Sequence, residues 1–63
     1  MNQQELITYK EAAEMLGLAK GTVYSMVHHN RIPHIRLGRR LVRFDAAELR
    51  KFVEAHRVEA RSA

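Results

Sequence analysis

The apolar positions near the start of the chain repeat at the spacing of a short helix. Thr8 and Glu11 form a Thr-x-x-Glu capping box, which marks a helix start. Gly17 is the residue type that ends a helix in the left-handed conformation. One apolar face at i, i+3 and i+4 consists of Ala12, Met15 and Leu16. The pattern predicts a helix over residues 9–16.

A second amphipathic helix is predicted over residues 20–29, after a tight turn. Its apolar stripe consists of Val23, Met26 and Val27. The helical period places an uncrowded polar face opposite this stripe, made of Gly21, Tyr24, Ser25, His28 and His29. Asn30 tolerates the left-handed conformation and can end the helix, and Pro33 forbids its continuation. Two short helices joined by a glycine-containing turn are typical of a helix-turn-helix.

Residues 33–44 alternate between polar and apolar side chains, which predicts a β-hairpin. The alternating apolar positions are Ile35, Leu37, Val42 and Phe44. We expect these side chains to pack on the helices and the arginines to project from the other face. Gly38 is expected to supply the positive φ of a tight turn. Leu41 breaks the alternation, and the pattern does not assign it to either face.

The last apolar stripe predicts a third helix that closes the core. Asp45 and Glu48 give it a box-like cap, and the stripe consists of Leu49, Phe52 and Val53. The elements together predict a mainly α fold with a small β-hairpin: a winged helix-turn-helix in which the hairpin is the wing. We expect one domain over residues 1–63, with a folded core at about 6–54 and a flexible tail at 57–63.

Positive charge is concentrated in the middle of the chain. The 63 residues carry a net charge of +4, and residues 28–44 hold five arginines and no acid: Arg31, Arg36, Arg39, Arg40 and Arg43. A local basic block suits a polyanion, with nucleic acid ahead of an anionic membrane. Charge alone supports a merely solvated face equally well. The polar helix face directly before the block favours DNA.

Metal and enzyme chemistry are not favoured by this sequence. His28, His29 and His34 invite a metal site, but adjacent histidines diverge on a helix and the chain has no cysteine. There is no glycine-rich phosphate loop and no nucleophile in a recognisable setting, so we expect neither an enzyme nor a cofactor. No run of 18 apolar residues is present, so no membrane span is expected.

Three segments in order resemble the excisionase-type, MerR-like winged helix-turn-helix domain: ITYKEAAEMLGLAKGTVYSMV, IPHIRLGRRLVRF and AELRKFV. The resemblance covers residues 6–54. It implies a second helix in the major groove, with contacts from Lys20, Thr22, Tyr24, Ser25 and His28. It also implies a wing against the backbone or minor groove, with contacts from Arg36, Arg39, Arg40 and Arg43.

The sequence departs from that family at the start of the second helix. Ala19 stands where Ser or Thr often caps the helix, at a cost of roughly 1 kcal/mol. Gly21 replaces a usual polar contact, so we expect a ragged first turn. No arginine lies between Lys20 and Arg31. This suggests that the second helix discriminates weakly between bases and that the wing contributes more of the affinity for DNA. Tyr24 has an alternative interpretation as an ordinary partly buried aromatic.

The resulting function is sequence-specific binding of double-stranded DNA. The resemblance implies a phage or mobile-element excisionase, a recombination directionality factor that bends attachment-site DNA. Its partners would be a tyrosine- or serine-type integrase and neighbouring copies of itself on DNA. We expect it in the cytoplasm of a bacterial or phage-infected cell, associated with the nucleoid. A small transcriptional regulator of the same fold is one alternative. A protein-interaction adaptor that uses the helix-turn-helix shape is the other.

Overall fold

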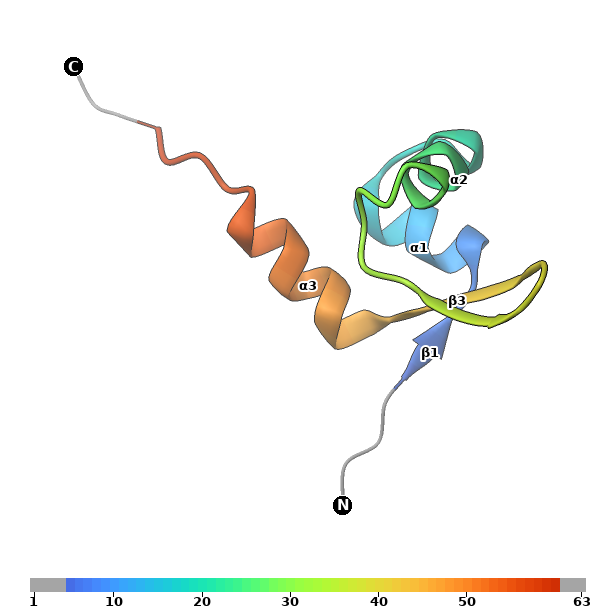
Figure 1. Ribbon diagram of the computed structural model, residues 1–63. Helices are drawn as coiled ribbons and strands as arrows, with labels where there is room; N and C mark the ends of the chain where they lie inside the picture. Colours follow the sequence, from blue (N-terminus) through green and yellow to red (C-terminus); the bar gives the residue numbers. More distant parts are fainter. Residues whose placement is uncertain (1–4, 61–63) are drawn as a thin grey trace.

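The computed structural model describes residues 5–60, which form three helices and a three-stranded antiparallel sheet (Figure 1). The elements in chain order are β1 (Leu6–Ile7), α1 (Tyr9–Leu16), α2 (Lys20–His28), β2 (Ile35–Gly38), β3 (Leu41–Asp45) and α3 (Ala46–Ala55). The predicted helix-turn-helix, hairpin and last helix are confirmed, and so is the winged helix-turn-helix fold. Residues 57–60 of the expected tail carry no helix or strand, and residues 61–63 lie outside the described part.

The ends of α1 follow the local signals in the sequence. The Thr8 hydroxyl accepts a hydrogen bond from the Glu11 amide at 3.2 Å, and the Thr8 amide donates to the Glu11 carboxylate at 2.9 Å. Gly17 is left-handed with a φ of 69°, and the Leu18 amide donates to the Ala13 carbonyl at 2.9 Å. The predicted capping box and glycine cap are both confirmed, because each depends only on neighbouring residues.

Helix α2 has a weaker start and a defined end. Ala19 occupies the N-cap position with no side-chain hydrogen bond, as its methyl group has no acceptor. Nevertheless α2 is helical from Lys20. Asn30 follows the helix in the left-handed conformation with a φ of 54°, as predicted. The weak cap leaves backbone amides at the start of α2 open to outside acceptors.

Strand β1 was not predicted. It pairs antiparallel with β3, in the register Leu6 with Asp45 and Ile7 with Phe44. The Ala46 amide extends this pairing by donating to the Glu5 carbonyl at 3.0 Å. Two residues are too few for an alternating pattern to show in the sequence. With β1 added, β3 becomes the central strand in the order β1-β3-β2.

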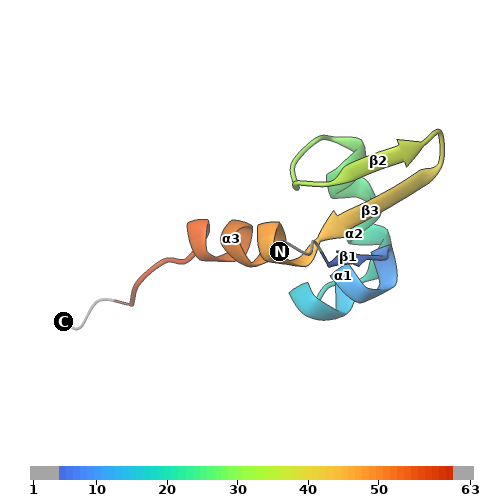
Figure 2. The same cartoon turned by 90° about the horizontal axis from the view of Figure 1, so that it is seen from below.

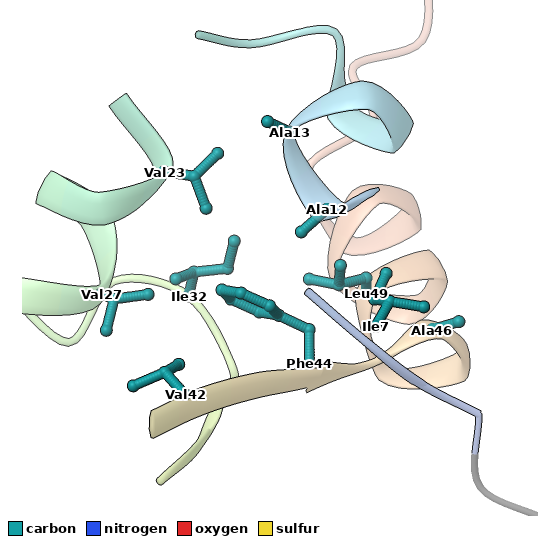
Figure 3. Close-up of a cluster of buried hydrophobic side chains, with 10 residues drawn as sticks. All are labelled: Ile7, Ala12, Ala13, Val23, Val27, Ile32, Val42, Phe44, Ala46 and Leu49. Atoms are coloured by element: carbon teal, nitrogen blue, oxygen red, sulfur yellow. The ribbon is translucent and has the colours of Figure 1, made fainter. Parts of the chain in front are cut away.

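The core is one small cluster centred on β3 (Figure 3). Phe44, Leu49 and Val23 are its largest fully buried side chains. The ring of Phe44 lies between the α2 side of the core and the α3 side, as Figure 3 shows. The remaining members are Ile7, Ala12, Ala13, Val27, Ile32, Val42 and Ala46. The Phe44 ring therefore lies where the two sides of the core meet, beside the direct contacts of α1 with β1, β3 and α3.

Two predicted core positions on the helices are exposed. Met15 is 40% exposed on α1, where Ala12 and Ala13 make the buried contacts instead. Val53 is 43% exposed because α3 extends away from the other elements, as Figures 1 and 2 show. The prediction that α3 closes the core therefore holds for its first turns, through Ala46 and Leu49. The Asp45 cap is confirmed by a hydrogen bond from the Ala47 amide at 3.0 Å.

The predicted division of the hairpin into apolar and basic faces is wrong for β2. Arg36 pairs with Val42, and Ile35 pairs with Arg43. Cross-strand partners share a face, so Arg36 lies on the side of the buried Val42. Leu37 is 55% exposed. Strand alternation identifies two faces but not the register, and a shift of one residue exchanges them.

Gly38 does not have the predicted positive φ. Within residues 5–60, positive φ values occur only at Gly17 and Asn30. The turn itself consists of Arg39 and Arg40, and Gly38 pairs with Leu41 at the end of the ladder. A register shift between Arg36 and Gly38 inserts one extra residue into β2, and such a bulge supplies the local twist that a left-handed turn residue would otherwise give.

Replacing glycine by alanine should therefore have opposite effects at the two positions. A Cβ at Gly38 would meet the Leu41 Cβ at 3.6 Å, which is ordinary contact. We expect Gly38→Ala to be neutral or to stabilise by up to about 1 kcal/mol, because alanine restricts the unfolded chain. Gly17→Ala should cost about 1–2 kcal/mol, because its left-handed backbone opposes any Cβ. Urea unfolding of both variants checks this, and a larger loss at Gly38 would restore the positive-φ interpretation.

Candidate nucleic-acid interface

An open groove lies between α2 and the β2–β3 hairpin, which we call the wing. Its volume is about 360 Å³. It is lined by Tyr9, Tyr24, Val27, His28, Arg36, Arg39, Arg40 and Val42. The structure thus brings two predicted contacts of the second helix together with three predicted contacts of the wing. The wing tip and α3 extend to opposite sides of the molecule, so α3 does not cover this groove (Figures 1 and 2).

The groove is strongly basic. Three arginines and no carboxylate line it. Two ion pairs are found within residues 5–60: Lys51 with Glu48 at 3.9 Å on α3, and Arg57, just after α3, with Glu54 at 2.8 Å. The guanidinium groups of the groove are therefore uncompensated within this part of the chain. Uncompensated guanidinium groups favour phosphate, whose geometry matches their donors.

Three aromatic rings, those of Phe44, Tyr9 and Tyr24, pack one against the next from the core to the groove. Tyr9 packs edge-on against Phe44 with ring centroids 5.3 Å apart, and it lies 5.7 Å from the ring of Tyr24. Tyr24 is 62% exposed, so the alternative of a partly buried aromatic is wrong for this residue. That description applies to Tyr9 instead, which is half-buried beside the core. The ring of Tyr9 therefore packs between Phe44 in the core and Tyr24 in the groove.

Tyr9 is the groove residue that the sequence analysis missed. It precedes Ala12 and Ala13 by three and four residues, so it extends their buried face, and this spacing was the available signal. Burial raises the pKa of the Tyr9 hydroxyl above its usual 10.0, and Tyr24 raises it further, whereas the positive charge of Arg36 lowers it. A phenol whose pKa lies above its usual value is protonated at neutral pH, so it can donate a hydrogen bond.

The other predicted contacts of α2 lie outside this groove. Thr22, Ser25 and Arg31 line a second hollow of about 520 Å³, on another side of the helix. The helical period places Ser25 opposite the buried Val23 and Val27, at the crest of the exposed face. Lys20 is exposed at the first turn and lines neither hollow. Predicted contacts thus lie on both flanks of one exposed helix.

Arg43 differs from the other wing arginines. It lies on the sheet face opposite Val42 and Phe44, beside its cross-strand partner Ile35. It is half-buried, and its guanidinium donates to the Val42 carbonyl at 2.9 Å. Arg36 and Arg43 therefore occupy opposite faces of the wing, although the sequence analysis grouped them together.

His29 and His34 bond to local carbonyls. The Nδ1 atom of His29 lies 2.9 Å from the Ser25 carbonyl, and that of His34 lies 2.8 Å from the Ile32 carbonyl. Across residues 5–60, no three His, Cys, Asp or Glu side chains are placed to hold a metal ion. In the same part of the chain, no helix has the length and apolar character needed to cross a membrane.

The fold and the groove define a small winged helix-turn-helix domain. Comparison with family models agrees: residues 6–57 match a family described as a helix-turn-helix domain. The chain belongs to this helix-turn-helix family, which includes excisionase-like DNA-binding domains and is typically non-enzymatic. DNA is the partner that this membership supports. Searches of curated proteins and of solved structures found no match.

Proposed function

We propose that the protein binds double-stranded DNA sequence-specifically, with α2 in the major groove and the wing against the adjacent backbone or minor groove. One observation carries the proposal: the exposed α2 side chains Tyr24 and His28 share a basic groove with Arg36, Arg39 and Arg40. A single α-helix fits the major groove, and neighbouring arginines then meet the phosphates that border it.

Different residues supply specificity and affinity in this arrangement. We expect Ser25 at the crest of α2, with Thr22 and His28 on its flanks, to meet base edges. Hydroxyl groups contact several bases, so Thr22 and Ser25 discriminate less sharply than an arginine that pairs with guanine. We expect Lys20, the three groove arginines and Arg43 on the other face of the wing to meet phosphates. Most of the affinity should therefore depend on salt.

The role we propose is that of an architectural excisionase that bends attachment-site DNA and assists an integrase, with further copies bound alongside. Family membership supports it, and so does the wing. Leu37 and Leu41 are both exposed next to Arg39 and Arg40. Apolar side chains flanked by arginines suit a minor groove that is opened and kinked. A protein that only contacts the outer surface of straight DNA does not need them.

Selection of random duplexes on the purified protein tests the function. We expect an enriched sequence whose binding, followed by fluorescence anisotropy, weakens linearly with the logarithm of salt concentration. Absence of both enrichment and salt-dependent duplex binding would favour the protein-interaction adaptor. Energy transfer between dyes on the two ends of the selected duplex then tests the architectural role. A complex with straight DNA would favour the transcriptional regulator.

A further inference from the structure

The groove also includes one residue of α1, an element that helix-and-wing binding does not involve. Tyr9, the first residue of α1, lines the groove together with Tyr24 and the three arginines. Its hydroxyl has no hydrogen-bond partner within residues 5–60. Its groove neighbours include three guanidinium groups, which can only donate, so an incoming acceptor shared with them would complete its hydrogen bonding.

Building on the proposed function, we propose that Tyr9 is a DNA contact: its hydroxyl donates a hydrogen bond to one backbone phosphate in the groove, opposite Arg36. A phosphodiester carries one negative charge and two free oxygens, so it can accept from the phenol and from the guanidinium together. With no carboxylate in the lining, nothing opposes the phosphate charge. The volume of about 360 Å³ leaves room for the sugars on either side of it.

The ring of Tyr9 is held in place before any DNA arrives. On one side, the Tyr9 ring packs edge-to-face with Phe44, with the ring centroids 5.3 Å apart, and Phe44 itself is fully buried. Tyr24 covers the ring from α2 at 5.7 Å. A donor on a fixed ring loses little conformational entropy on binding, whereas the exposed arginines of the wing must be ordered by the DNA. The phosphate in this groove would therefore set the register of α2 along the duplex.

Tyr9→Phe tests this contact because it removes the hydroxyl and keeps the ring. We expect its affinity for the selected duplex to fall roughly tenfold, in the range for a hydrogen bond to a charged group. The salt slope should not change, because the phenol is neutral. Arg36→Ala is the matched comparison from the same groove, and it should reduce the slope by about 1. Thermal unfolding of Tyr9→Phe should match the original protein.

Single methylphosphonate substitutions in the selected duplex identify the phosphate. The original protein should lose affinity at several positions, and Tyr9→Phe should show a smaller loss at one of them only. Equal binding by Tyr9→Phe and the original protein, or equal losses at every position, would overturn the Tyr9 contact and leave the proposed function in place. Failure of the original protein to bind any duplex would instead overturn the proposed function itself.

Discussion

Phe44→Ala is expected to unfold most of the protein at room temperature. The ring is fully buried on the central strand and joins the α2 and α3 sides of the core. Truncating a buried Phe costs about 3–5 kcal/mol, which combines lost burial with the cavity left behind. A single core in a chain this small rarely provides more than about 3–5 kcal/mol. Circular dichroism should show lost helix, and urea titration should show no folded baseline.

Leu37→Ala is the matched control for Phe44→Ala. Both residues are large and apolar, and both belong to the same hairpin, but Leu37 is 55% exposed. Its truncation should cost at most about 1 kcal/mol, because only part of the side chain leaves an apolar setting. If Leu37→Ala proved as harmful as Phe44→Ala, the observed register of β2 on β3 would be wrong. The apolar side chains of β2 would then belong to the core.

Among variants that stay folded, replacing Arg39 and Arg40 together by alanine should produce the largest loss of DNA binding. Both residues form the turn of the wing and are exposed. Each lost phosphate contact lowers affinity on the order of fivefold near 0.15 M salt, so the double variant should bind roughly 30-fold more weakly. The salt slope should fall by about 1–2 units. Anisotropy titrations on selected and random duplexes should show the same loss for both.

A double substitution on α3 controls for total charge. Arg50→Ala with Lys51→Ala also lowers the net charge from +4 to +2, at exposed positions on the helix that extends away from the wing. We expect this variant to bind DNA almost as well as the original protein. Equal losses in the two double variants would mean that net charge, and not the wing, attracts the DNA. A folded wing variant with unchanged affinity would remove the wing from the mechanism.

The parts of the fold that sequence predicted are those governed by neighbouring residues. The Thr8 and Glu11 box, the Gly17 cap and the left-handed Asn30 each depend on a few adjacent positions. Strand β1 and the bulge in β2 could not be read in the same way. Both are set by pairing with β3. Strand β1 is distant from β3 in sequence, and the bulge in β2 depends on a shift of one residue in the register with β3.

The same distinction, between features set by neighbouring residues and features set by strand pairing, applies to the candidate site. Charge clustering located the basic block, and helical periodicity located the exposed face of α2. Neither signal could separate Arg36 from Arg43, because the face that each occupies follows from the strand register. Tyr9 was overlooked for another reason. Its spacing to Ala12 marks a buried face, and only the packed structure shows that this face borders the groove.

The exposed face of α2 has a consequence for how this protein can acquire new targets. Lys20, Thr22 and Ser25 contribute nothing to the buried core, and a side chain added at Gly21 would meet no atom within 4 Å. Evolution, or an engineer with a randomised library, can therefore vary these four positions without disturbing the packing. Tyr9 allows no such freedom, since its ring rests on Phe44. Substitutions that change the DNA target are therefore tolerated on α2, whereas the need to keep the fold limits them at Tyr9 on α1.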